Sequence, residues 1–338
     1  MNREICFFCV GTGGHVLPVK NLILELNNLG IDTTNIFVVC DERAKKYLED
    51  LDVNIFTTQI YFSKNGIKGY VFNFIKILSS TKKIYNFLKK LNISVVLTTG
   101  AYIAPVAALM SLLLRAKFYI QEQNVYAGLG NKVSAFFAES VFISFENTRN
   151  IKKNKIKYTG PIVNTTLLRK DEASLSSQTI GFVGGSQGSE EINNFVEQFL
   201  NSEIQSKFNI VHITGKNKNT FKVKKTNYKS IEFVKNMDDF YKEVDILVGR
   251  AGGGSLEAAY LGIPQILIPY KYGTTSSHQK LNAKYLEENK FGHIVYTFDD
   301  LLDKVEDISI KLKSNKLQLK RISIGNKKIA QELYEQIN

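Results

Sequence analysis

A glycine-rich stretch in the second half of the chain carries the residue types that bind phosphorylated sugars. It reads VGRAGGGSLEAA from Val248 to Ala259, between an apolar run and a helix-forming one. Consecutive glycines let a backbone approach a ligand closely, and the free N–H groups at a helix start favour an anion, most often a phosphate. Glu257, one turn into that helix, can accept hydrogen bonds from sugar hydroxyls. A glycine-rich strand-to-helix connection without a ligand is the simpler alternative for one such loop.

Two further glycine loops weaken that alternative. GTGGH at Gly11 and GGSQGS at Gly184 also follow apolar strand-like runs and precede helical ones. The first loop does not match the dinucleotide fingerprint, because position 16 is Val16 rather than glycine. Two α/β halves that each begin with a strand, a glycine loop and a helix suit an enzyme of nucleotide sugars, with ligands at the carboxyl ends of the strands.

The elements that must position these loops alternate between strand and helix, which predicts an α/β fold with parallel sheets. Strands are expected at 5–10, 36–40, 53–57, 95–97, 118–121, 141–144, 156–158, 179–183, 210–213, 231–234, 244–248 and 264–268. Helices are expected at 16–28 with Pro18 in the first turn, and at 41–51, 70–91, 103–114, 190–200, 237–241, 256–261, from 278, and in the tail. A linker at 159–164 divides the chain into domains 1–164 and 165–338, with the last helix a candidate to pack back on the N-terminal domain.

Composition supports a two-domain globular protein. The chain has 338 residues, of which 44% are hydrophobic and 22% charged, and length alone favours about two domains. No apolar run is long enough to span a bilayer, and we expect no signal peptide. Cys6 and Cys9 form a CxxC within a strand, so their side chains point to opposite faces. Together with Cys40 they are expected to be buried and apolar, in a reducing, cytoplasmic compartment.

The net charge of +12 is concentrated in the first half, where no acidic residue occurs between Asp52 and Glu122. Such an excess indicates an anionic partner. Nucleic acid is not favoured, because no recognised binding motif accompanies the charge.

A series of motifs along the chain resembles glycosyltransferase family 28, and within it the inverting UDP-N-acetylglucosamine (UDP-GlcNAc) transferases of peptidoglycan synthesis. The matching stretches, in the family's order, are GTGGHVLPV at Gly11, TTGAYIAPVAA at Thr98, QEQNVYAGLGNK at Gln121, YTGPIVN at Tyr158, GGSQGS at Gly184, HITGK at His212, RAGGGSLEAAYLGIP at Arg250 and HQKLNA at His278. The resemblance implies the GT-B fold, in which two Rossmann-like domains with parallel sheets face each other across a cleft.

The resemblance also implies a donor site for UDP-GlcNAc. Its residues would be Thr12, Gly13, Gly14, Asn124, Asn164, Ser186, Val234, Arg250, Gly252, Gly253, Gly254, Ser255, Glu257 and Gln279. Within this set, Ser186 and the 252–255 loop would contact the diphosphate. The backbone of Val234 would contact uracil, and Glu257 would bind the ribose. Gln279 would bind the hydroxyls of GlcNAc. Two features depart from the family pattern: Asn164 stands where an arginine is usual, with Arg169 a candidate substitute, and the stretch 250–264 is one residue short.

The implied acceptor is lipid I, undecaprenyl-diphosphate-linked MurNAc-pentapeptide, with His15, Tyr102 and Asn124 as its binding residues. The MurNAc 4-hydroxyl would displace UDP from C1 of GlcNAc with inversion, giving the β-1,4 link of lipid II. His15 is the candidate general base, because an ordinary histidine pKa lies near neutrality; a sugar contact or a helix cap is the alternative. Helix amides would stabilise the leaving diphosphate, so no cofactor or metal is expected.

The implied setting is the cytoplasmic face of the bacterial cell inner membrane, as a peripheral protein of cell-wall synthesis, cell shape and division. Lysine-rich helices between 66 and 90 would lie on the anionic bilayer, extended by Met110, Leu113, Leu114 and Phe118. A solvated lysine face is the alternative. Other cell-wall synthesis proteins are candidate partners. Alternative functions are another GT-B lipid glycosyltransferase, a UDP-GlcNAc 2-epimerase, or a membrane-associated scaffold without catalysis.

Overall fold

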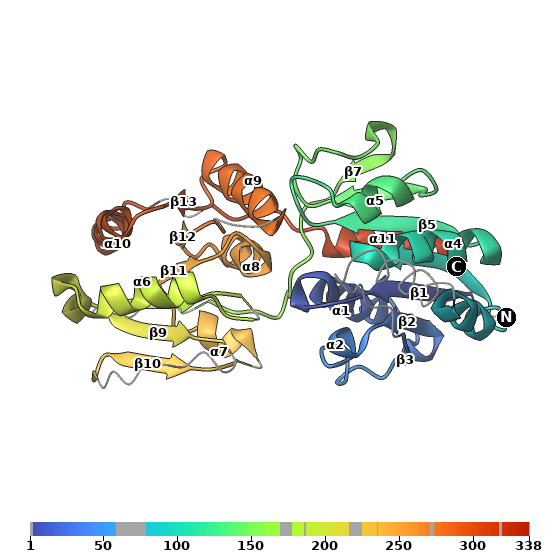
Figure 1. Cartoon of the computed structure of the whole chain (residues 1–338), viewed down its shortest axis with the longest axis horizontal. Helices are drawn as coiled ribbons and strands as arrows, with labels where there is room; N and C mark the ends of the chain where they lie inside the picture. Colours follow the sequence, from blue (N-terminus) through green and yellow to red (C-terminus); the bar gives the residue numbers. More distant parts are fainter. Residues whose placement is uncertain are drawn as a thin grey trace, which may run out of the picture. The chain divides into compact units, whose positions relative to one another are not determined.

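The computed structural model describes residues 3–58, 79–169, 178–185, 187–215, 225–234, 236–270, 274–317 and 320–337, without the side chains of 274–277 (Figure 1). The chain divides into two compact units, one of Met1–Ile162 with Ile324–Asn338 and one of Val163–Ser323. The division falls close to the expected boundary at 164/165, and the C-terminal segment returns to the first unit.

The first unit is built on a seven-stranded parallel sheet with the strand order β3-β2-β1-β4-β5-β6-β7. Its strands are β1 (Glu4–Cys9), β2 (Ile36–Cys40), β3 (Asn54–Thr57), β4 (Ile93–Thr98), β5 (Lys117–Glu122), β6 (Ser140–Ile143) and β7 (Ile156–Tyr158). The central strands are nearly continuous apolar runs, as expected for parallel strands covered on both faces.

The second unit has a six-stranded parallel sheet with the order β10-β9-β8-β11-β12-β13. Its strands are β8 (Thr179–Val183), β9 (Asn209–Ile213), β10 (Tyr228–Ile231), β11 (Ile246–Gly249), β12 (Gln265–Leu267) and β13 (His293–Ile294). The predicted strand at 231–234 was wrong, because β10 ends at Ile231, where its partner strand ends at Ile213. The short strand β13 was not predicted. The predicted fold class, α/β with two parallel sheets, is confirmed.

The helices connect these strands and cover the sheets. They are α1 (Gly13–Asn28), α2 (Glu42–Lys45), α4 (Ala104–Leu114), α5 (Leu129–Ser134), α6 (Glu190–Leu200), α7 (Met237–Tyr241), α8 (Gly253–Leu261), α9 (Thr274–Glu288), α10 (Phe298–Lys313) and α11 (Asn326–Ile337), and residues 79–88 are also helical. Because α1 begins at Gly13, Pro18 lies in its second turn rather than its first. The helix predicted at 41–51 ends at Lys45. Residues 66–78 of the predicted basic segment lie outside the described residues.

The two cysteines of the CxxC lie in separate hydrophobic cores on opposite faces of the first sheet. Cys9 belongs to the core under α1 and α11, and Cys6 to the core that includes α4. Both are fully buried and unpaired, and burial raises the pKa of each thiol. The pair is therefore structural, as its position within a strand predicted.

The C-terminal helix α11 completes the core of the first unit. Figure 1 shows it within that unit, and it packs against α1 and β4. Its buried side chains are Ile329, Ala330, Leu333 and Ile337. The far end of the chain therefore stabilises the helix that follows the first glycine loop.

We expect Leu333→Ala to destabilise the first unit by about 2–5 kcal/mol, the usual cost of removing a buried leucine side chain. Urea unfolding followed by circular dichroism measures this loss. Lys328→Ala, an exposed position on the same helix, is the control and should change stability by less than about 0.5 kcal/mol. Equal effects of the two substitutions would contradict the assigned packing of α11.

Candidate functional site

In each sheet, the order in which successive strands are added changes direction at one point. The glycine loops follow the strands at that point. In the first sheet the reversal is between β1 and β4, and in the second between β8 and β11. The segments that follow these strands include Gly11–His15, Thr99–Tyr102, Gly184 and Gly185 with Gln187–Ser189, and Arg250–Ser255. Ligands of open α/β sheets bind at such points, beyond the carboxyl ends of the strands. Each unit therefore has one candidate ligand edge.

In the first unit, the candidate edge includes the start of α1. Thr12 is the N-cap residue in an extended conformation, and within the described part of the chain its side chain makes no capping hydrogen bond. The N–H groups of the first helical turn have no intrahelical acceptor. Gly13 and Gly14 occupy that turn, and Gly14 is exposed. The start of α1 can therefore accept an anionic group.

His15 is held by the loop that follows β4. Its Nδ1 lies 2.9 Å from the carbonyl oxygen of Thr99, and the Thr99 hydroxyl donates to the His15 carbonyl at 2.7 Å. Because a carbonyl oxygen only accepts, Nδ1 donates to it, and Nε2 is left as the ring nitrogen that can take up a proton. This tautomer is the one that a general base needs.

Asn124 is oriented by a carboxylate that the sequence analysis did not single out. Its backbone N–H and its side-chain Nδ2 both donate to Glu122 Oε1, at 2.9 and 3.1 Å. The second oxygen, Oε2, accepts from the backbone of Gly128 and from Asn131 Nδ2. Glu122 is 3% exposed. It therefore fixes the loop between β5 and α5, and its only sequence signal was its place inside the QEQN motif.

Tyr102 is tied to a second buried carboxylate. Its hydroxyl donates to Asp41 Oδ2 at 3.1 Å and accepts from Arg43 at 3.3 Å. Burial, followed by the charge of Asp41, raises the pKa of Tyr102 to about 12. The predicted role of Tyr102 in binding the acceptor stays a prediction. The hydrogen bonds show that the residue also joins two loops of the first unit.

In the second unit, the loop at the start of α8 has an accessible backbone. Gly252 is the N-cap residue, and no described atom lies within 4 Å of the position that a Cβ on Gly252 or Gly253 would take. A Cβ on Gly254 would lie 3.4 Å from the Tyr241 hydroxyl. Ser255 is buried, and its hydroxyl donates to the Gly252 carbonyl at 2.6 Å. The hydroxyl therefore braces the loop, and its predicted contact with the diphosphate stays a prediction.

Arg250 joins the ends of neighbouring elements. NH1 donates to the Ile268 carbonyl at 2.8 Å and pairs with Glu191 at 2.9 Å, and NH2 donates to the Ser189 hydroxyl at 2.6 Å. The guanidinium also lies over the ring of Tyr270, 4.5 Å from its centre. Arg250 is 8% exposed. It therefore connects the end of β11 to the end of β12 and to the start of α6, and in this arrangement it positions the predicted donor loops.

Glu257, which is partly buried, forms a pair with the fully buried Tyr241. The Tyr241 hydroxyl donates to Glu257 Oε2 at 2.8 Å and lies 3.3 Å from the Gly254 carbonyl. Burial raises the pKa of Glu257 to about 7, although the hydrogen bond from Tyr241 works to lower it. The same burial, with the nearby carboxylate, raises the pKa of Tyr241 well above its ordinary value. Near neutral pH the carboxyl group is therefore close to its midpoint between the neutral and ionised forms.

The remaining predicted donor residues occupy varied positions. Ser186 lies outside the described residues. Val234 follows β10 and packs partly buried against the core of the second unit. Gln279 lies in α9, and its Oε1 is buried with no hydrogen-bond partner within the described part of the molecule. That oxygen can accept a hydrogen bond from a sugar hydroxyl.

Asn164 and Arg169 do not place a guanidinium at the glycine loop. Asn164 Oδ1 accepts from the backbone and the hydroxyl of Thr166, forming a local turn. Arg169 donates to the carbonyl of Gly262 at 3.0 Å. Gly262 ends the nine-residue helix α8, so this contact lies about 13 Å along the helix from the glycine loop. In the structure, Arg169 therefore does not substitute for the family arginine.

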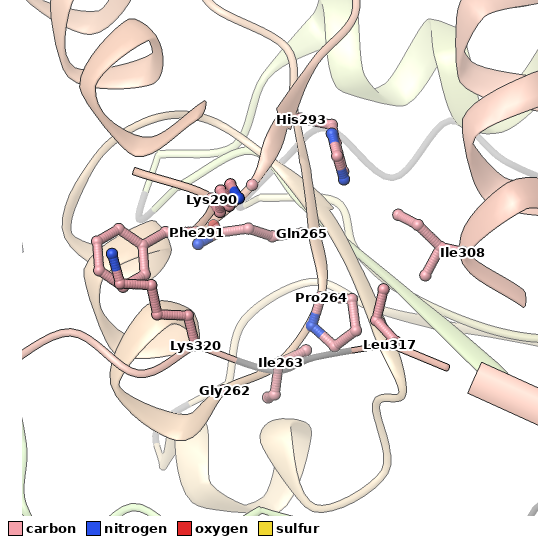
Figure 2. A pocket seen from close by; sticks show the side chains of 11 residues that line it. Gly262, Ile263, Pro264, Gln265, Lys290, Phe291, His293, Ile308, Leu317 and Lys320 are labelled. Carbon is pink, nitrogen blue, oxygen red and sulfur yellow. The ribbon is translucent and has the colours of Figure 1, made fainter. Parts of the chain in front are cut away.

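His212 is a core residue of the second unit, and the small pocket of that unit lies beside the end of α8. His212 is fully buried between Asn193 and Tyr228, and burial lowers its pKa to about 4. Figure 2 shows a pocket lined by Lys290, His293 and Lys320 together with Gly262 and its neighbours. It lies beside the C-terminal end of α8, away from the loop at the start of that helix. The described residues contain no cluster of His, Cys, Asp or Glu that could hold a metal ion.

The first unit exposes an apolar ridge over α4 and α5, which pack against each other. The ridge consists of Leu109, Leu112, Leu113, Leu129, Val133, Phe136 and Phe137. Of the predicted membrane-facing residues, Leu113 is exposed and Leu114 is partly buried, whereas Met110 and Phe118 are core residues and their prediction was wrong. Met110 on α4 and Phe118 on β5 both belong to the core on one face of the first sheet. Across the described ranges, no helix has the length and apolarity needed to cross a membrane.

Comparisons with known proteins bear on both units. Residues 5–143 match the glycosyltransferase family 28 N-terminal domain, and residues 179–337 match its C-terminal domain. A relative from Rickettsia canadensis (strain McKiel), named UDP-N-acetylglucosamine–N-acetylmuramyl-(pentapeptide) pyrophosphoryl-undecaprenol N-acetylglucosamine transferase, is 30% identical and covers 99% of this chain and 100% of its own.

Solved structures share the fold. The crystal structure of Acinetobacter baumannii MurG is similar with a TM-score of 0.72 at 22% identity, covering 99% of both chains. The UDP-GlcNAc 2-epimerase from Neisseria meningitidis bound to UDP-GlcNAc gives a TM-score of 0.67 at 14% identity, covering 98% of this chain and 99% of that one. These likenesses show the GT-B fold that the motifs predicted.

The Glu257–Tyr241 pair predicts a pH dependence of donor binding. In its predicted contact with the ribose, Glu257 would accept hydrogen bonds from both hydroxyls only as the ionised carboxylate, so affinity for UDP-GlcNAc should fall below about pH 7, by up to tenfold per pH unit. Tyr241→Phe removes the hydrogen bond that lowers the pKa, so the midpoint should move to higher pH. Glu257→Gln should bind weakly with a flat profile. Calorimetric titration with UDP-GlcNAc between about pH 5.5 and 8.5 measures this, and an unchanged midpoint in Tyr241→Phe would contradict it.

Proposed function

This chain belongs to glycosyltransferase family 28, and we propose that it transfers GlcNAc from UDP-GlcNAc to the MurNAc 4-hydroxyl of lipid I, giving lipid II and UDP. The observation that carries the proposal is the match of both family domains to the two units, with a full-length relative named for this transfer. The local geometry of each candidate edge supports it. The second unit would bind the donor and the first the acceptor.

The donor edge has groups suited to each part of a nucleotide sugar. The start of α8 offers backbone N–H groups and the positive end of a helix dipole to the diphosphate. Glu257 would accept the ribose hydroxyls, and Gln279 Oε1 would accept a hydroxyl of GlcNAc. Val234 would contact uracil through its backbone, and Ser186 the diphosphate. Arg250 would act by holding the loops in place, since NH1 and NH2 of its guanidinium already donate to protein groups.

The reaction is an inverting displacement. The MurNAc 4-oxygen attacks C1 of GlcNAc while its proton passes to His15 Nε2, and the bond from C1 to the UDP oxygen breaks. Charge develops on the β-phosphate as UDP leaves, and the helix amides at the glycine loop stabilise it. Asn124 and Tyr102 would orient the acceptor sugar beside His15. The proposed reaction uses no cofactor, and a metal is not needed for charge stabilisation when the amides supply it.

We place the protein at the cytoplasmic face of the cell membrane, bound through the first unit. The apolar ridge carries side chains with large exposed fractions, including Leu129 at 74% and Phe136 at 64%. Lys152 lies over the Phe136 ring, 5.4 Å from its centre, and Lys155 donates to the Phe136 carbonyl. Apolar side chains with adjacent cations suit the interface of an anionic bilayer, where the polyprenyl acceptor resides. Other cell-wall synthesis proteins are further candidate partners at this surface.

Transfer of labelled GlcNAc to a short-chain lipid I analogue, with a chelator present, tests the reaction and the base together. His15→Asn keeps an amide donor for the Thr99 carbonyl but cannot take a proton, so kcat should fall roughly 10²–10⁴-fold. The dissociation constant of UDP-GlcNAc should not change. His293→Ala, in the pocket of Figure 2, is the matched control and should keep normal activity.

Other outcomes of this assay separate the alternatives. Full activity in His15→Asn would exclude His15 as the base while leaving the transferase in place. UDP-GlcNAc binding without transfer to lipid I would favour a different lipid acceptor or a non-catalytic scaffold. Formation of UDP-ManNAc without any acceptor would indicate an epimerase.

Membrane binding is tested on the apolar ridge. Leu112→Ser with Phe136→Ser should weaken binding to phosphatidylglycerol vesicles at least tenfold, because burying each of these side chains contributes about 1.5–3 kcal/mol. Activity with a water-soluble acceptor analogue should stay normal. Ile310→Ser, at a 67% exposed apolar residue of α10, is the control, and vesicle sedimentation is the measurement. Equal binding by all three proteins would contradict the assigned surface.

A further inference from the structure

One buried carboxylate connects the loops of the candidate acceptor edge. Asp41, immediately after β2, is 0% exposed. Its Oδ1 accepts from the backbone N–H groups of Gly11 and Ala44, at 3.1 and 2.9 Å. Its Oδ2 accepts from Arg43 Nε and NH2, at 3.0 and 2.7 Å, and from the Tyr102 hydroxyl at 3.1 Å. Segments far apart in the sequence thus meet at one side chain.

Helix capping explains only part of this arrangement. Asp41 is the N-cap residue of α2 and needs only the bond from Ala44 for that role. The bonds from Gly11 and Tyr102 come instead from the loops after β1 and β4, where the first sheet reverses its strand order. Burial works to raise the pKa of Asp41, but the hydrogen bonds from Gly11, Ala44 and Arg43 outweigh it and hold the pKa below its usual value. The carboxylate therefore stays charged and bound to these partners.

Arg43 extends from this carboxylate towards the first glycine loop. Its side chain is 52% exposed, and NH2 lies 4.0 Å from the position that a Cβ on Gly11 would take. The same guanidinium donates to the Tyr102 hydroxyl. The orientations of Arg43, Tyr102 and the glycine loop are therefore set by a common partner.

We propose that Asp41 is a positioning residue for the acceptor: it holds the first glycine loop, Arg43 and Tyr102 in the arrangement that binds the acceptor, without touching it. This inference rests on the proposed function. It assigns to Asp41 an effect on the acceptor KM that a helix cap alone would not have.

Asp41→Asn is the decisive substitution. One amide oxygen can still accept from Gly11 and Ala44, but the Nδ2 group would face the donors of Arg43 and Tyr102. We expect the acceptor KM to rise about tenfold or more, the size expected from losing hydrogen bonds to a charged group. The dissociation constant of UDP, the nucleotide part that the second unit would bind, should be unchanged. An unchanged acceptor KM in a folded Asp41→Asn protein would overturn the proposal.

Asp32→Asn is the matched control. Asp32 also caps a short helix, through Thr34, in the same unit, but among the described residues it makes no hydrogen bond to either loop of the candidate edge. This variant should keep the normal acceptor KM, and an equal rise in both variants would show a general effect of capping and overturn the proposal. If Asp41→Asn does not fold, Arg43→Lys takes its place, since it keeps the charge but loses the paired donation to Asp41. An unchanged acceptor KM would then count against the proposal.

A measurement without turnover separates this inference from the proposed function. The titration of Tyr102 can be followed by NMR on protein with ¹³C-labelled tyrosine. Its pKa of about 12 should fall in Asp41→Asn and stay unchanged in Asp32→Asn. If the unaltered protein binds UDP-GlcNAc but does not transfer to lipid I, the acceptor assignment fails, and the titration decides whether Asp41 organises the loops. No difference in the Tyr102 titration would overturn its positioning role.

Discussion

A buried charge must be surrounded by hydrogen-bond partners, and each unit uses this requirement to hold its ligand loops. In the first unit the charge is Asp41, whose oxygens bind groups from the loops after β1, β2 and β4. In the second unit it is Arg250, whose guanidinium donates to the Ile268 carbonyl at the end of β12 and to the Ser189 hydroxyl at the start of α6. Removing a partner from such a group leaves the charge unsatisfied in a poorly solvated place. The loops are therefore constrained although they have little regular structure of their own.

This constraint suits an enzyme that binds phosphates through its backbone. Glycine loops offer N–H groups but, having no side chains, cannot anchor themselves, so the rigidity must come from neighbouring residues. Close glycine contacts add to it: a Cβ on Gly188 would lie 2.4 Å from the Thr214 carbonyl oxygen, and one on Gly130 would lie 2.2 Å from that of Ala101. Preorganised N–H groups stabilise developing charge without reorganising during the reaction. The buried charged residues and the closely packed glycines therefore both restrict the movement of the same loops.

Much of the fold could be predicted because apolar strands and glycine loops have strong local patterns. Strand β2 and helix α7 were predicted to the residue. The predictions failed where contacts with distant residues determine the structure. The end of β10 is set by the end of its partner strand β9. The sequence of α4 is apolar throughout, so it does not show that Met110 faces the core while Leu113 faces outward. Arg169 likewise looked available for the nucleotide, but the fold places it at the far end of α8.

The sequence by itself determined the order of most elements, the family, and the candidate side chains for the chemistry, because motif spacing and hydrophobic pattern are local properties. Only the tertiary structure decided how those side chains are held. The proton on His15 Nδ1 depends on the Thr99 carbonyl, and the raised pKa of Glu257 depends on burial beside Tyr241. The partners of Asp41 come from three separate loops. Such contacts depend on which strands become neighbours in the sheet, and no local pattern in the chain records that.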